Sequence, residues 1–85
     1  MADKQEQLQV RVISSSKTFF DGKAAAVSSV NKVGPFDVLP LHENFITLLK
    51  EKVVIHGLDG KAIAIPCENG LLEVSENVVK VFIGI

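Results

Sequence analysis

The sequence lacks most of the residues on which catalytic, metal-binding and nucleic-acid-binding sites depend. Its 85 residues include one cysteine, two histidines and no tryptophan or tyrosine. The single cysteine, Cys67, excludes an intramolecular disulfide and a cysteine-based metal cluster. Nine basic and ten acidic residues give a net charge of −1. The chain therefore has neither the basic face nor the stacking aromatic residues typical of nucleic-acid-binding proteins.

Long apolar runs are also missing. The start, MADKQEQ, is polar and has no apolar core of a signal peptide, and no uninterrupted apolar run could span a bilayer. We expect residues 1–7 to form a polar tail, and any membrane association to come through a partner. Hydrophobic residues nevertheless make up 47% of the chain. Because a small domain buries a modest share of its surface, some of them are expected to face a partner.

Alternation of apolar and polar residues runs through most of the chain and indicates strands. Leu8, Val10 and Val12 alternate with Gln9 and Arg11. Near the end, the alternation puts one set of apolar residues on a single face: Val79, Val81, Ile83 and Ile85. Residues 24–30, AAAVSSV, fit a short helix or a strand, and the turn signals on either side favour a strand.

Turn signals divide the strands. We expect turns at Asp21-Gly22, Asn31-Lys32 and Glu76-Asn77, and a hairpin at Asp59-Gly60, which is the strongest such signal in the chain. Gly34-Pro35 and Asn69-Gly70 are further expected breaks, where the chain turns or a strand bulges. The segment PFDVLP lies between two prolines, which confine a strand to the edge of a sheet or mark its ends.

One segment, residues 41–52, could be helical, because several of its apolar residues recur at helix spacing. A single turn leading into a strand fits it at least as well. The sequence as a whole predicts an all-β fold: a small two-sheet β-sandwich of about eight to ten short strands over residues 8–85, with no long helix.

No pattern in the chain predicts catalysis. His42 and His56 belong to no recognisable nucleophile motif, and His42, Glu43 and Asp37 do not have the spacing of a zinc site. No phosphate-binding glycine loop is present. We therefore predict no catalytic, cofactor-binding or metal-binding residues, and a buried, unreactive thiol at Cys67.

The order of four motifs resembles the amino-terminal β-sandwich domain of the epsilon subunit of the F-type ATP synthase. The motifs are LQVRVIS, FFDG, VGPFDVLPLHENFITLL and ENGLLEVSENVVKV, which together span about residues 8–84. They match an opening strand, a Phe-Asp-Gly turn, a Gly-to-His segment followed by Thr-x-Leu, and a late Leu-Glu-Val strand.

The chain departs from this family pattern around residues 35–44. Asp37 stands where the family usually has a second glycine, and Glu43-Asn44 replaces Ala-Pro after the histidine. Leu41 stands where glycine or asparagine is frequent. Family members commonly continue into a carboxy-terminal helical hairpin that inhibits ATP hydrolysis, and this sequence stops before it.

The resemblance implies a non-catalytic rotor subunit of the central stalk. Such a subunit packs on the gamma subunit and the c-ring, couples proton-driven rotation to ATP synthesis, and lies at the cytoplasmic face of the membrane, or on the matrix or stroma side in an organelle. The isolated chain is expected to be a monomer without cofactors. The implied partner surface consists of Pro35, Phe36, Leu41, His42, Glu43, Asn44 and Phe45.

Two other hypotheses remain from the residues alone. The first is an unrelated β-sandwich interaction module that matches these motifs by chance, and it predicts no affinity for gamma. The second is an enzyme that uses His42 with Glu43, which predicts an activity lost in His42→Ala. Phe36 and Phe45 also fit the sandwich core as well as a partner surface.

Overall fold

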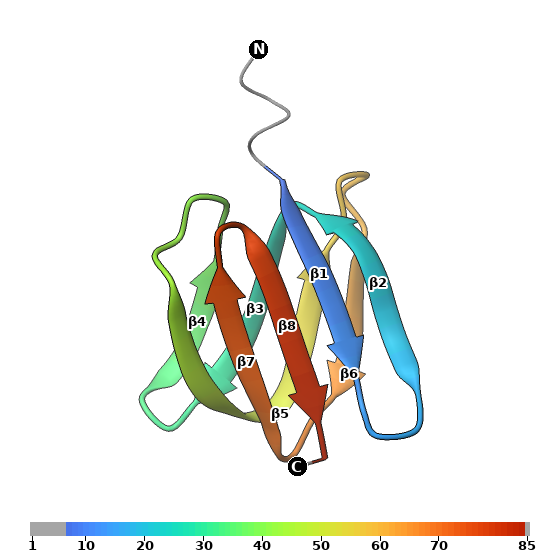
Figure 1. The fold of residues 1–85 in the computed structure, drawn as a ribbon, viewed down its shortest axis with the longest axis vertical. Helices are drawn as coiled ribbons and strands as arrows, with labels where there is room; N and C mark the ends of the chain where they lie inside the picture. The colour runs from blue at the N-terminus through green and yellow to red at the C-terminus, as the bar shows by residue number, and fades with distance from the viewer. Residues whose placement is uncertain (1–6, 85) are drawn as a thin grey trace.

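The computed structural model describes residues 7–84 and consists of strands and connections, with no helix among those residues (Figure 1). The predicted tail at 1–7 lies outside this range except for Gln7, and so does Ile85. The strands are β1 (Leu8–Ile13), β2 (Thr18–Ala24), β3 (Ala26–Asn31), β4 (Gly34–Val38), β5 (Phe45–His56), β6 (Ala62–Pro66), β7 (Gly70–Ser75) and β8 (Val78–Ile83).

The strands form two layers, as the alternation predicts. Sheet A has the order β2-β1-β8-β7-β5, and sheet B has the order β6-β5-β3-β4. Neighbouring strands are antiparallel except β1 and β8, which are parallel. The prediction of an all-β sandwich is confirmed, with eight strands.

Strand β5 belongs to both layers. Its first part, Phe45–Leu49, pairs with β7 in sheet A, and residues 52–56 pair with β6 in sheet B. Between these parts the register with β3 shifts, and Glu51 has a φ of 74°, so the strand bends at a bulge. The hydroxyl of buried Ser29 donates a hydrogen bond to the Lys52 carbonyl (2.7 Å), which satisfies a polar group at the bend. Residues 41–52 thus follow the strand alternative.

The core lies between the layers and follows the period of two in each strand. Strand β1 contributes three fully buried residues, Leu8, Val10 and Val12. They lie on the same inward face of sheet A as Val79 and Val81 of the neighbouring strand β8. Each of the six remaining strands contributes at least one further core residue. These residues are Ala24, Val27, Val38, Leu49, Val53, Ile55, Ile65, Leu72 and Val74, with Cys67 after β6. The predicted inward face of the last strand is therefore confirmed for Val79 and Val81.

Three of the expected turns are confirmed. Lys32-Val33 connects β3 to β4, residues 57–61 connect β5 to β6, and Glu76-Asn77 connects β7 to β8. Glu76 and Asn77 both have positive φ (51° and 66°), as the tight turn of a hairpin with the favoured twist requires.

The turn expected at Asp21-Gly22 is wrong. Both residues lie inside β2, where Asp21 pairs with Arg11 and Gly22 pairs with Val10. A Cβ at position 22 would lie 3.5 Å from the ring of Phe20, which is an ordinary contact, so neither a turn nor a lack of space requires glycine there. An Asp-Gly pair predicts a turn only when no neighbouring strand takes up its main-chain groups, and β1 does so here.

The described residues contain no helix that is long and apolar enough to cross a membrane.

Candidate interaction surface

The connection between β4 and β5 forms a fixed surface at one end of the sandwich. It opens with a β-turn in which the His42 N–H donates to the Leu39 carbonyl (3.1 Å). Pro40 and Leu41 are the central residues, and Leu41 has a φ of 70°. This is the geometry of a type II turn, in which the second central position normally holds glycine or asparagine. Leucine at this position is strained, and its side chain is 75% exposed.

Two hydrogen bonds tie this connection to the β7–β8 turn. The Leu41 N–H donates to the Asn77 side-chain oxygen (2.7 Å). The Glu76 N–H donates to the Asn44 side-chain oxygen (3.0 Å). The two loops are far apart in sequence, so these bonds hold the main chain at Leu41 and the side chain of Asn44 against the β7–β8 turn. Between the loops lies an open hollow of about 410 Å³, lined by Leu41, His42, Glu43, Asn44, Glu76 and Asn77.

A row of rings leads from this hollow into the sandwich. The His42 ring lies 4.8 Å from the Phe45 ring, and Phe45 makes an edge-to-face contact with Phe36 at 6.0 Å. The His42 Nδ1 lies 2.7 Å from the Glu43 carbonyl, so with a proton on Nδ1 it donates to that oxygen. Phe36 and Phe45 are half-buried and pack against the core. His42 therefore has an aromatic neighbour on one side and a main-chain acceptor on the other, and neither is a nucleophile.

The structure does not bring all seven predicted surface residues together. Leu41, His42, Glu43 and Asn44 form the loop surface described above. Phe36 and Phe45 are directed toward the core. Pro35 is exposed near the start of β4, where it pairs with Val30, and Leu41 follows the other end of that strand. The predicted surface residues therefore lie in two places, at the start of β4 and in the loop after it. The rings of Phe36, Phe45 and His42 lie between these two places.

Sequence reasoning missed a second hollow, of about 600 Å³, between the β3–β4 turn and the first half of β5. It is lined in part by Val33, Ile46 and Leu48, whose side chains are 90%, 63% and 67% exposed. The signal was present in the run FITLL. A strand buried on one face should alternate, and Ile46 and Leu48 are apolar on the face that points away from the core.

The other chemistry-bearing residues that the structure describes lie apart from the loop surface. Within residues 7–84 no group of three or more His, Cys, Asp or Glu side chains is placed to hold a metal ion. The Ser28 hydroxyl donates a hydrogen bond to the Asp37 carboxylate (2.6 Å). The Ser28 hydroxyl oxygen also lies 2.8 Å from His56 Nε2. Because the serine proton is committed to the carboxylate, Ser28 is a structural bridge rather than a nucleophile activated by His56. Cys67 is buried as predicted, and burial raises the pKa of its thiol.

Comparison with known families supplies the context for this surface. Residues 7–84 match the family described as "ATP synthase, Delta/Epsilon chain, beta-sandwich domain". The chain belongs to this family. A curated relative, the ATP synthase epsilon chain of Corynebacterium aurimucosum, is 32% identical over 76 residues, which cover 87% of this chain and 62% of the relative.

Solved structures share the fold at low identity. A chain of the Euglena gracilis mitochondrial ATP synthase (OSCP, F1 and c-ring) superposes with a TM-score of 0.84 at 19% identity, covering 91% of this chain and 50% of that one. A chain of the Tetrahymena thermophila mitochondrial ATP synthase central stalk and c-ring gives a TM-score of 0.74 at 12% identity, covering 92% and 63%. The chain thus spans between half and two thirds of the length of these relatives.

Proposed function

We propose that this chain is a non-catalytic rotor subunit of an F-type ATP synthase. In this role it packs on the gamma subunit and the c-ring, and it couples proton-driven rotation to ATP synthesis without an inhibitory hairpin within residues 7–84. The observation that supports it most is the family match over residues 7–84, together with relatives described as an epsilon chain and as central-stalk components.

The loop surface fits the proposed contact with gamma. Leu41 exposes most of its side chain from a strained backbone that two cross-loop hydrogen bonds hold in place. A main chain that is already held in place loses little conformational freedom on binding, so the exposed Leu41 side chain is a favourable anchor for a protein partner. His42 and Asn44 supply polar groups beside it, and Glu43 supplies a charge at the rim.

The opposite end of β4 fits the proposed contact with the c-ring. Pro35 stiffens the strand immediately after the β3–β4 turn, and Val33 in that turn is 90% exposed. The c-ring would place the chain at the membrane surface through its partners, on the cytoplasmic face, or on the matrix or stroma side in an organelle.

The test is co-purification of the chain with the gamma subunit of its own organism, comparing wild type with Leu41→Asp. The matched control is Leu58→Asp, because Leu58 is also exposed (53%) but lies in the β5–β6 turn. We expect a stoichiometric complex that Leu41→Asp weakens about tenfold or more and Leu58→Asp leaves unchanged.

Two results would contradict the proposal at different levels. Equal effects of both aspartates would show that gamma does not use the loop surface. Failure of the folded wild-type chain to bind gamma would exclude the rotor role and leave an interaction module of the same fold.

A further inference from the structure

The connection between β6 and β7 holds the one asparagine of the sequence that a glycine follows, in the pair Asn69-Gly70. In such a pair the main-chain nitrogen of the glycine can attack the carbonyl carbon of the asparagine side chain, because glycine has no Cβ to hinder the approach. The other three asparagines precede Lys32, Phe45 and Val78, whose side chains hinder the same attack. The side-chain amide of Asn69 is therefore the least protected one in chemical terms.

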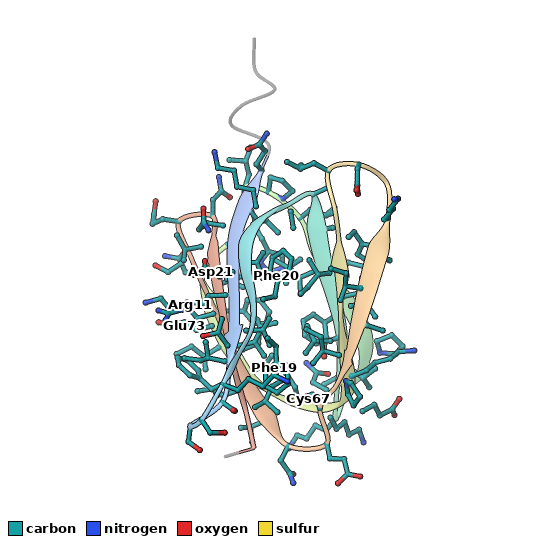
Figure 2. The ribbon with its side chains drawn as sticks, turned by 90° about the vertical axis from the view of Figure 1, so that its right-hand side faces the viewer. Arg11, Phe19, Phe20, Asp21, Cys67 and Glu73 are labelled. Atoms are coloured by element: carbon teal, nitrogen blue, oxygen red, sulfur yellow. The ribbon has the colours of Figure 1, made fainter. Side chains whose placement is uncertain are left out.

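Packing requires the glycine of this pair. Gly70 is buried, and a Cβ there would lie 2.5 Å from the Cys67 sulfur and 3.0 Å from the Phe82 carbonyl oxygen. Cys67 lies near the lower end of the sandwich in Figure 2, close to the segment that leads into β7. A larger residue would have to displace the main chain as well as the thiol, so the fold retains the reactive pair.

The side chain of Asn69 is open to water while its main chain is held. The residue is exposed, and its carbonyl accepts a hydrogen bond from the Gly84 N–H (2.7 Å) just after β8. The water that the second half of the reaction consumes therefore has access to the amide carbon.

The strand register shows that the attacking nitrogen is not free. Successive residues of a strand direct their main-chain groups to opposite neighbours. Because the Asn69 carbonyl is bonded on the β8 side, Gly70 directs its N–H toward β5, where it pairs with Leu49. The nitrogen must leave this pairing before it can attack, so the reaction requires the end of β7 to open.

We propose that Asn69 is a modification site, whose amide converts to a carboxylate each time an opening of β7 releases the Gly70 nitrogen for attack. A bond forms between this nitrogen and the side-chain carbonyl carbon of Asn69. The bond from that carbon to the side-chain nitrogen breaks, and ammonia leaves with the proton of the Gly70 amide. Water then opens the cyclic imide at either of its carbonyl carbons, which yields aspartate or isoaspartate.

Either product changes the hollow beside the first half of β5. Asn69 lines this hollow next to Glu68, with Lys32 and Lys50 also in its lining, so the reaction adds a second carboxylate there. Isoaspartate also adds one carbon to the main chain immediately before Gly70, which displaces the glycine from its fit against the Cys67 sulfur. This modification does not depend on the proposed binding of gamma or the c-ring.

Mass spectrometry of the 85-residue chain tests the site, first in urea at mildly alkaline pH. Conversion of an amide to an acid raises the mass, and fragmentation of peptides assigns it to one residue. We expect Asn69 to convert about tenfold or more faster than the other asparagines, because a glycine follows it alone. Asn69→Gln should abolish this conversion, because glutamine has to close a larger ring. The matched control is Glu68→Gln, which keeps the Asn-Gly pair and should convert like wild type.

A comparison of two reactions at Gly70 tests the requirement for opening. The reference is a synthetic peptide of residues 66–73, in which the Gly70 nitrogen has no strand partner. Asn69 in the folded chain should convert about tenfold or more slowly than in the peptide. Hydrogen exchange of the Gly70 amide, followed by nuclear magnetic resonance, should slow by the same factor to within about threefold, because both reactions need the same opening.

Each measurement has a result that overturns the proposal. In urea, faster conversion of another asparagine, or an unchanged conversion in Asn69→Gln, would exclude Asn69 as the site. A folded chain that converts as fast as the peptide would exclude the requirement for opening. So would a folded chain whose Gly70 amide exchanges while Asn69 stays unconverted for longer than the shared factor allows.

Discussion

Strands β4 and β6 border the same sheet, but they are held and protected in different ways. Both place a proline where an N–H would face outward, Pro35 in β4 and Pro66 in β6. On β4, Asp37 adds a charge and joins Ser28 in a hydrogen bond that ties the edge to its neighbour. Strand β6 has no polar side chain and depends on main-chain bonds and on burial of Ile65. Strand β4 thus has a polar contact in addition to the burial of Val38, whereas the side chains of β6 hold their edge by apolar packing alone.

The largest effect on stability is expected when the buried side chain of Ile65 in β6 is shortened. Ile65 is 6% exposed, so Ile65→Ala should lower the free energy of unfolding by about 2–4 kcal/mol. Ile63→Ala is the matched control on the same strand, and it should lower it by about 1 kcal/mol or less because the side chain is half-exposed. Urea unfolding followed by circular dichroism measures both. Equal losses would mean that β6 is not held by burial of Ile65.

For β4, the corresponding change is Ser28→Ala in the neighbouring strand β3, because Ser28 holds Asp37 of β4. It removes the bridge between Asp37 and His56, and because the site is largely open to solvent the loss should be about 1 kcal/mol. Ser15→Ala, in the exposed β1–β2 connection, is the control and should change the unfolding free energy by less than about 0.5 kcal/mol. A Ser28→Ala chain as stable as wild type would show that the polar tie does not secure this edge.

A substitution in the turn after β4 should raise the free energy of unfolding, whereas the two changes above lower it. Leu41→Gly relieves the positive φ and should raise the free energy of unfolding by about 0.5–1 kcal/mol. Leu39→Gly, two residues earlier, has no such strain to relieve and should lower it, because glycine adds freedom to the unfolded chain. Thermal melts compare the two. If Leu41→Gly also destabilises, the strain at this turn is compensated by contacts of the leucine.

The smallest effect concerns the thiol that follows β6. Well below the ordinary thiol pKa of about 8.5, Cys67 is protonated in the folded and unfolded chains, so it adds no pH dependence. Above that pH the unfolded chain loses the proton first, since burial raises the pKa of the folded-state thiol. The free energy of unfolding should then fall as pH rises, until the pH passes the folded-state pKa. Cys67→Ala should remove this slope between pH 8 and 10, and an unchanged slope would assign it to other groups.

Alternation predicted the strands and their inward faces because a period of two is a local property of the backbone. It did not predict the bend of β5, since the positive φ of Glu51 depends on how two sheets meet. The break expected at Asn69-Gly70 is present, because residues 67–69 connect β6 to β7 and Gly70 begins β7. Glycine is required there because a Cβ would lie 2.5 Å from the Cys67 sulfur, a packing contact that sequence spacing does not reveal.

The candidate surface was predictable only in part. The resemblance selected residues 35–45, and the loop at Leu41–Asn44 is exposed and fixed. The distribution of these residues over two ends of β4 follows from strand direction, and the tie to Asn77 is a contact between distant segments. Ile46 and Leu48 were missed because the run FITLL fits either a helix or a strand, and only the strand puts them on the outer face.

A single strand shared by two layers changes how the domain responds to load. Force applied at the Phe45 end of β5 reaches sheet B along covalent bonds, without relying on side chains that could slide between the layers. We expect the two layers to unfold together, because unfolding of either layer would also unfold the part of β5 that belongs to it. Slow amide hydrogen exchange should therefore extend along both halves of β5 with one common opening energy, which is the property that the proposed rotor role would require.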